Sequence, residues 1–268
     1  SLPMLSAASD TPDRPGACQL AAVEQDRFNA PDGAPANEFG CAIALSGDTV
    51  IVGAQLDSEI GQYTGAAWIF RFINGDWVPE MKLVSPDADP WDQFGFSVAI
   101  DGDVAAVGCP ADDEVGDNAG TVTVFRNAGS FWYAEAVIHA DDADPNDLFG
   151  ASIALEGSTL VIGCHPDVNG GVATGSVYVF EESGGNWTQS QNHLADSTTA
   201  NSWFGRKVDL RGDRIAASAY LADSSEPASG AVFIFERNQG TWAQSAVITP
   251  EAPQAGHFFG FDITLDDD

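Results

Sequence analysis

The stretch FGFSVAIDGDVAAVGCPADDEVGDNAGTVTVF, residues 94–125, contains in order the features that decide the fold. Its first seven residues alternate apolar and small side chains, which is the period of a half-buried β-strand. An Asp-Gly-Asp turn at 101–103 leads to a second apolar strand over 104–109, and glycine supplies the positive φ that such turns need. A polar loop follows, and a third strand is predicted over 121–125.

A fourth strand is predicted over residues 131–139, and an acidic loop then leads to the next Phe-Gly pair. Four antiparallel strands with short hairpins and one longer connection to the next unit are typical of a propeller blade. No part of the chain has a sustained apolar period of 3.6 residues, so we expect very little helix.

The same pattern recurs along the chain with a period of 55 residues. The Phe-Gly pairs begin at Phe39, Phe94, Phe149, Phe204 and Phe259. Tryptophans keep the same phase in the fourth strands, at Trp77, Trp132, Trp187 and Trp242. A fixed period of this kind predicts units that bury their apolar faces against their neighbours, so these tryptophans should pack between blades.

The period predicts an all-β propeller with four complete blades, at residues 39–93, 94–148, 149–203 and 204–258. A fifth blade is predicted to be split between the two ends of the propeller region, 17–268: residues 259–268 supply its first strand and residues 17–38 its fourth.

The segment that should form the third strand of this split blade, TPDRPGA at 11–17, carries two prolines and cannot pair as an interior strand. Either the chain is a piece of a longer propeller, such as a seven-bladed one, or another segment completes the sheet. Residues 1–16 form an N-terminal arm whose apolar start, Leu2, Met4 and Leu5, is the candidate for that contact.

The charge of the chain is strongly negative, with 10 Lys and Arg against 40 Asp and Glu and a net charge of −30. Such a surface repels phosphates, so nucleic acid and anionic lipid are excluded as partners, and divalent cations or basic partners are favoured. No apolar stretch approaches the roughly 20 residues that span a bilayer, so no membrane insertion is expected. Residues 1–16 show no signal peptide.

The ordered string Phe-Gly, Val-Ala-Ile-x-Gly-Asp, Val-Gly-Cys-Pro, Gly-x-Val-x-Val-Phe and Trp resembles the FG-GAP repeat. That repeat builds the β-propeller heads of integrin α subunits and of many bacterial and archaeal surface proteins, so the resemblance implies a propeller at the cell surface or outside the cell. The family often carries a D-x-D-x-D-G calcium loop between its first two strands. Here that stretch is a bare turn, and the family's ligands have no matching positions. The fourth unit departs most, because Arg206 and Lys207 enter its first strand.

Acidic side chains alternate in the loops between blades. They are Asp87, Asp89 and Asp92 and, one period later, Asp142, Asp144 and Asp147. Alternating carboxylates suit Ca²⁺, which takes 6–8 oxygen ligands, so these six residues are the predicted metal ligands. The alternative is that they are turn formers and solvated charge. Asp57, Asp112 and Asp167 share a further phase inside the blades.

Trp91 and Trp203 lie outside the phase of the core tryptophans, in the loops before Phe-Gly. They are candidates for stacking on sugar rings or for anchoring a partner, and packing over the blade edge is the alternative. Cys109 and Cys164 share one phase and should fill small buried sites. The sequence leaves open a disulfide between Cys18 and Cys41.

The four histidines show no ligand spacing, and no nucleophile motif or phosphate-binding loop is present. The sequence therefore predicts an extracellular, non-catalytic protein for adhesion or structural assembly, which associates with itself or with a protein partner by strand addition. A glycan-binding module is the first alternative. A hydrolase on a propeller scaffold is the second, and it would need an acid, a base and a nucleophile converging on one face.

Overall fold

The computed structural model describes residues 29–32, 36–129, 131–165, 168–169, 172–192 and 201–266. These residues form four antiparallel sheets of four strands each and contain no helix, which confirms the all-β prediction. No helix able to cross a membrane is therefore found in the described part of the chain. The N-terminal arm, with Leu2, Met4 and Leu5, lies outside the described residues, as does most of 17–38.

Each complete repeat unit forms one sheet whose strands are paired in chain order. The first blade contains β1 (Phe39–Ser46), β2 (Thr49–Ala54), β3 (Ala66–Ile73) and β4 (Asp76–Leu83). The second contains β5 (Ser97–Asp101), β6 (Val104–Cys109), β7 (Thr121–Asn127) and β8 (Trp132–Ile138). The third contains β9 (Ser152–Glu156), β10 (Thr159–Cys164), β13 (Ser176–Ser183) and β14 (Asn186–Gln191), with the short pair β11 (Val168–Asn169) and β12 (Val172–Ala173) in its long loop. The fourth contains β15 (Phe204–Arg211), β16 (Arg214–Ala219), β17 (Ala231–Asn238) and β18 (Thr241–Ile248).

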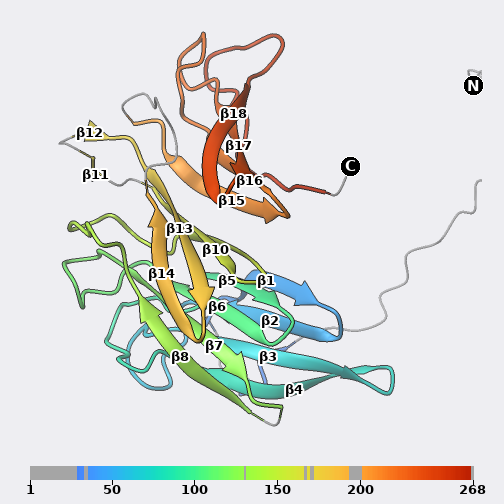
Figure 1. Cartoon of the computed structure of the whole chain (residues 1–268). Helices are drawn as coiled ribbons and strands as arrows, with labels where there is room; N and C mark the ends of the chain where they lie inside the picture. Colours follow the sequence, from blue (N-terminus) through green and yellow to red (C-terminus); the bar gives the residue numbers. More distant parts are fainter. Residues whose placement is uncertain are drawn as a thin grey trace, which may run out of the picture.

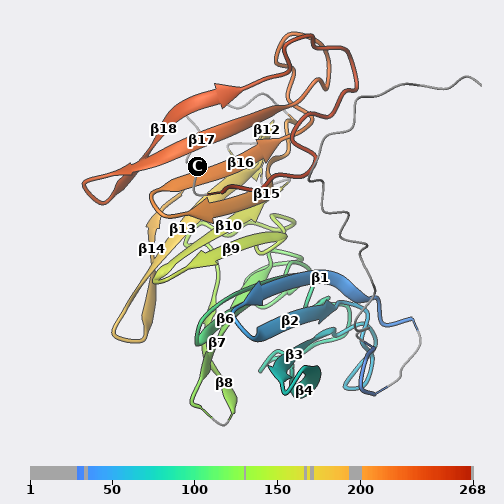
Figure 2. The ribbon, with the colours of Figure 1, turned by 90° about the vertical axis from the view of Figure 1, so that its right-hand side faces the viewer.

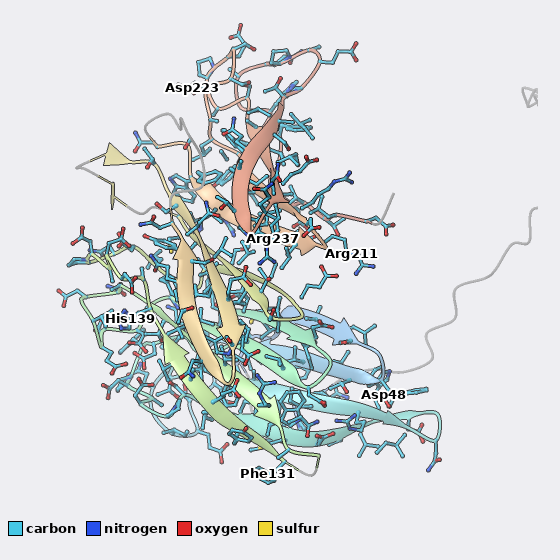
Figure 3. The ribbon with its side chains drawn as sticks, viewed as in Figure 1. Asp48, Phe131, His139, Arg211, Asp223 and Arg237 are labelled. Carbon is cyan, nitrogen blue, oxygen red and sulfur yellow. The ribbon has the colours of Figure 1, made fainter. Side chains whose placement is uncertain are left out.

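The four sheets follow one another around an open arc (Figures 1 and 2). The first strands of successive blades, β1, β5, β9 and β15, pack next to each other along the inner side of the arc. The connections between blades and the longer loops lie at the end of the blades where His139 is labelled, whereas hairpin turns such as those of Asp48 and Phe131 lie at the other end (Figure 3). We call these the loop end and the turn end.

Apolar cores lie between neighbouring blades, as a repeat architecture requires. The core between the first two blades joins Ile51 and Ile69 of the first to Phe94, Val107 and Trp132 of the second. Equivalent cores join the second blade to the third and the third to the fourth. The predicted packing of tryptophans between blades is confirmed where a neighbouring blade is present, because Trp132, Trp187 and Trp242 are buried. Trp77 is only half-buried.

The Phe-Gly pair marks the place where one blade touches the next. Phe94 forms a parallel bridge with Gly65 of the preceding blade. A Cβ atom on Gly95 would collide with the carbonyl oxygen of Ala66, so only glycine allows this approach. The predicted strand from residue 94 begins only at Ser97, because Phe94 bridges to the neighbouring blade, although the Gly95 amide still donates to the Gly108 carbonyl of β6 at 3.0 Å.

The fifth blade is begun but not completed by the described residues. Phe259 bridges to Gly230, and the Leu265 amide donates to Asp209 Oδ2 at 2.6 Å, so this segment lies against the fourth blade as a first strand would. Residues 259–266 nevertheless form no ladder, because no described strand pairs with them. At the other end of the arc, Ile43 and Leu45 of the first blade are each 61% exposed. The faces that flank the gap are therefore apolar and uncovered.

Candidate cation-binding site between the first two blades

Two loops meet at the loop end of the second blade. The connection from β4 to β5 carries the predicted ligands Asp87, Asp89 and Asp92, and the β6–β7 loop lies beside it. The Ala111 amide donates to the carbonyl oxygen of Asp92 at 3.3 Å and so ties the two loops together. Each loop is also shaped by its own carboxylate: Asp92 Oδ2 accepts from the Asp89 amide at 2.6 Å, and Asp112 Oδ1 accepts from the Glu114 amide at 2.8 Å.

Six carboxylates converge on one cavity of ≈ 180 Å³ at this junction. They are Asp87, Asp89, Asp92, Asp112, Asp113 and Glu114. Asp92 and Asp112 are each only 3% exposed, and one oxygen of each lies with the Cys109 sulfur in a group whose atoms are all within 4.8 Å of one another. Asp92 Oδ1 receives no hydrogen bond from any described residue.

The electrostatics of the site oppose full ionisation of these carboxylates. Burial is the largest cause that raises the pKa of Asp92 to about 6; the Asp89 amide acts against it, and the charges of Asp112, Asp89 and Asp87 add to the rise. Burial likewise raises the pKa of Asp112. The pKa of Glu114 is raised chiefly by a hydrogen bond with Asp87, which requires a proton between the two carboxyl groups. A bound cation would relieve this repulsion.

The equivalent junction of the first blade contains a positive charge of its own. Asp32, Asn37, Asp57 and Glu59 lie 55 positions before Asp87, Asp92, Asp112 and Glu114. The side chain of Lys82, on β4, contacts the three carboxylates of this group. Lys82 Nζ lies 2.9 Å from Asp57 Oδ2, 2.9 Å from Asp32 Oδ2 and 2.6 Å from Glu59 Oε2. Burial alone would lower the pKa of Lys82, but its hydrogen bonds with these carboxylates outweigh burial and raise it. In the second blade, Val137 takes the place of Lys82.

The first junction also has fewer carboxylates. Asn37 replaces Asp92, and its amide donates to Asp57 Oδ2 at 2.8 Å. The lysine and this amide together satisfy the buried Asp57, which is 2% exposed. At the second junction the equivalent Asp112 Oδ2 accepts instead from the neutral Thr121 hydroxyl, at 2.9 Å, and no cationic side chain lines the cavity.

The other two junctions are less complete. At the third, the Asp144 amide donates to Asp147 Oδ2 at 2.7 Å, and Asp142 accepts from the Asn192 side chain at 3.3 Å. The position equivalent to Asp112 there is Asp167, which lies outside the described residues. At the fourth junction, Ser202, Ala222 and Ser224 occupy the positions of Asp92, Asp112 and Glu114. The second junction is therefore the candidate that the described residues define.

The sequence pointed to only part of this site. Asp112 and Asp113 were visible as acidic residues inside the blade, but their approach to Asp87, Asp89 and Asp92 depends on how the two loops meet in space. The signal that could have found it is the shared phase of Asp57 and Asp112, together with the exchange of Lys82 for Val137.

The two predicted aromatic sites differ in the structure. Trp91 is 54% exposed and packs edge-on against Tyr63, with ring centroids 4.7 Å apart. Trp203 is half-buried between His165, at 5.2 Å, and Tyr220, at 5.7 Å, so it packs over the blade edge.

The cysteines follow the prediction where they are described. Cys109 and Cys164 are fully buried free thiols. Cys41 is a free thiol that donates to the Gly95 carbonyl at 3.4 Å, and Cys18 lies outside the described residues.

The matches of this chain to a known protein family have the same 55-residue period. The family model of the FG-GAP repeat matches residues 22–70, 77–125, 132–180 and 187–235. The last three matches each run from the fourth strand of one blade to the third strand of the next, so each spans one of the junctions described above. No curated protein matches the chain.

Among solved structures, a candidate 6-phosphogluconolactonase from Bacteroides uniformis has a similar fold, with a TM-score of 0.52 and 16% sequence identity. The match covers 78% of this chain and 57% of that one, so this chain spans little more than half of the length of the similar structure. At this identity the likeness concerns the fold alone.

Proposed function

Because this chain belongs to the FG-GAP repeat family, we propose that it is a secreted or cell-surface binding protein without catalytic activity, in which Ca²⁺ joins the first two blades. The observation that carries the cation is the pair of junctions. A lysine ammonium lies among three carboxylates at the first, and six carboxylates without a cationic side chain line the cavity at the second.

The donor atoms favour Ca²⁺ over a transition metal. Carboxylate oxygens are hard ligands, and a site with several of them on flexible loops suits the 6–8 ligands and variable geometry of Ca²⁺. Cys109 is the one soft ligand nearby, but burial raises its pKa well above the ordinary value and keeps it a neutral thiol. The ligands would be Asp87, Asp89, Asp92 and Asp112, with Asp113 and Glu114 at the rim of the cavity.

The proposed role in adhesion or assembly is supported by the uncompleted fifth blade. Its first segment lies against the fourth blade without a partner strand, and the first blade presents Ile43 and Leu45 to the same gap. Unpaired strand edges and uncovered apolar faces favour the addition of a strand. The N-terminal arm of a second copy is the proposed donor, which would make the contact heterologous and able to repeat.

The cation is tested by thermal unfolding of the whole chain in Ca²⁺ and in Na⁺ at matched ionic strength. Ca²⁺ should raise the Tm of the wild type, and calorimetric titration should show a single strong site. Asp92→Asn should abolish both effects, whereas Asp76→Asn at an exposed turn should leave them unchanged. Equal melting curves in the two salts would refute the calcium site and leave only screening.

The assembly is tested separately, by light scattering of the chain with and without residues 1–10. The proposal expects a polymer that falls apart into monomers when the arm is deleted. A wild type that stays monomeric at all concentrations, or a polymer that survives the deletion, would exclude the arm as the link between copies.

A further inference from the structure

A second cavity, of ≈ 550 Å³, lies on the inner side of the arc, away from the cation site. The beginnings of the four inner strands β1, β5, β9 and β15 line it, and so does the segment 262–264. The cavity therefore lies where the central channel of the propeller opens at the loop end.

Two basic side chains, Arg206 and Lys207, line this cavity. Five of the eight Lys and Arg residues that the structure describes form ion pairs with carboxylates, but Arg206 and Lys207 form none. In a chain with 40 acidic residues, two adjacent cations without a carboxylate partner are unexpected. The Arg206 guanidinium lies 6.0 Å from the centroid of the Phe261 ring, a contact that neutralises no charge, so the charge of both groups is available to a ligand.

The fold does not require basic residues at these two positions. In the third blade the equivalent residues are Ala151 and Ser152, and in the second they are Phe96 and Ser97. The backbone of β15 is held by other groups, since the Lys207 amide donates to Ser218 Oγ and the Val208 amide to Ser152 Oγ. A small side chain serves the structure equally well, so the two cations point to a ligand.

The two carboxylates that share the cavity, Asp209 and Asp262, accept hydrogen bonds from backbone amides and form no ion pair with Arg206 or Lys207. Asp209 accepts from the Leu210 amide at 2.9 Å and from the Leu265 amide at 2.6 Å. Asp262 accepts from the Ile263 amide at 3.1 Å. The positive charge also reaches the buried His165, whose pKa is lowered to about 4 by burial and by the charges of Arg206 and Lys207.

Other groups of the cavity are suited to a hydroxylated ligand. Gln55 lines it, and its Oε1 atom is buried without a hydrogen-bond partner. Such an orphaned acceptor calls for a donor such as a hydroxyl group. The Phe96 ring offers an apolar surface in the same wall, and Ser97 and Ser152 add polar atoms.

We propose that the central cavity binds an acidic saccharide. A uronate carboxylate would pair with the Arg206 guanidinium and the Lys207 ammonium, and ring hydroxyls would donate to Gln55 Oε1. Arginine suits this role because its planar fork binds a carboxylate with two hydrogen bonds. The negative outer surface would keep large polyanions at a distance and leave short acidic sugars as the ligands that enter. The site is independent of the Ca²⁺ proposed above, so binding should be the same in Ca²⁺ and in EDTA.

The test is a calorimetric titration of the whole chain with digalacturonate, with neutral galactobiose as the uncharged counterpart and with sulfate as a simple anion. Digalacturonate should bind, and its affinity should fall with added salt. Galactobiose and sulfate should each bind at least tenfold more weakly. Binding of sulfate as strong as that of the uronate would overturn the saccharide, and binding of galactobiose as strong would overturn the role of charge.

The matched variant gives the fourth blade the two residues that the third blade has at the equivalent positions. Arg206→Ala with Lys207→Ser restores residues that this fold already carries at the same positions, so the protein should fold with an unchanged Tm. Its affinity for digalacturonate should fall at least tenfold. Arg214→Ala removes an exposed ion pair of the same blade and should bind like the wild type. Unchanged binding by the double variant, or no binding by the wild type, would refute the proposal.

Discussion

The first and second repeat units have the same backbone plan but neutralise their loop carboxylates in different ways. At the first junction Lys82 contacts Asp32, Asp57 and Glu59, and Asn37 stands where the second unit has Asp92. At the second junction six carboxylates line the cavity, and Val137 stands where the first unit has Lys82. The loops themselves are retained, so what changes is whether a cationic side chain lies among the carboxylates.

Buried carboxylates are costly unless they are paired. At the first junction the paired cation is the side chain of Lys82, which belongs to the chain itself. Under the function proposed above, the second junction takes its cation from the solution, which would make the packing of the first blade on the second responsive to Ca²⁺. The two units also differ in how far a preceding blade covers the tryptophan of their fourth strand. Trp132 is buried by the first blade, whereas Trp77 is only half-buried.

The largest expected effect on stability comes from removing the tryptophan that is buried between two blades. Trp132 is 1% exposed, and its Nε1 donates to Glu80 Oε1 of the first blade at 2.9 Å. Trp132→Ala should lower the free energy of unfolding by about 3–5 kcal/mol, as truncation of a buried aromatic residue does. Trp77→Ala should cost clearly less. Urea unfolding of both variants measures the difference, and equal losses would show that the two tryptophans are covered alike.

Removing the built-in cation should have the next largest effect. Lys82→Val leaves Asp57 buried without its ammonium partner and gives the first junction the residue that the second has at this position. In EDTA the variant should lose about 2–3 kcal/mol of stability, because breaking a buried ion pair exposes the full cost of the remaining charge. Ca²⁺ should restore much of that loss. Lys82→Arg, which keeps the charge, is the control.

If Lys82→Val were as stable as the wild type in EDTA, the ammonium would contribute nothing to this junction. A loss that Ca²⁺ fails to restore would instead show that the three remaining carboxylates do not make a site.

The reverse exchange should have a smaller effect of opposite sign. Val137→Lys places an ammonium group at the second junction and should raise stability in EDTA by about 1–2 kcal/mol. It should also abolish the rise in Tm that Ca²⁺ causes in the wild type. Val247→Lys is the matched control, because the fourth junction has Ser202, Ala222 and Ser224 at the positions of Asp92, Asp112 and Glu114 and keeps only Asp223, at the position of Asp113. A variant that still responds to Ca²⁺ like the wild type would place the cation elsewhere.

The sequence predicted the blades well because one pattern is repeated in phase. The Phe-Gly pair could be recognised without the structure since the close approach of Gly95 to Ala66 excludes every side chain. The burial of Trp132 followed from the same period. The two prolines at 11–17 also indicated that the fifth blade is incomplete, but the first strand predicted at 259–268 did not appear, because no described strand pairs with residues 259–266.

The candidate sites were harder to predict because each one is assembled from several units. Asp87, Asp89 and Asp92 were identified by their alternation, but Asp112 joins them through a contact between two loops. Arg206 and Lys207 were visible as departures from the repeat, and their meaning depends on the inner strands that surround them. Alternation is a local signal, whereas a cavity between blades depends on packing.

The smallest expected effect is a dependence of stability on pH that comes from Asp92. Its pKa is raised to about 6 in the folded protein, from an ordinary value of 3.8, because the carboxyl group is buried among Asp112, Asp89 and Asp87. Between these two values the folded state holds a proton that the unfolded state has lost. Stability from this group is therefore present at low pH and falls as the pH rises from about 4 to 6.

Urea unfolding in EDTA between pH 4 and 7 measures this dependence, with Asp92→Asn as the reference because its amide does not titrate. Relative to this variant, the wild type should lose up to about 1 kcal/mol over the interval, after allowance for screening by solvent. At pH 7 Ca²⁺ should reverse the loss in the wild type only, because the cation replaces the proton as the partner of the buried carboxylate. Parallel curves for the two proteins in EDTA would mean that Asp92 ionises as freely in the folded chain as in the unfolded one, and the second junction would then need no cation.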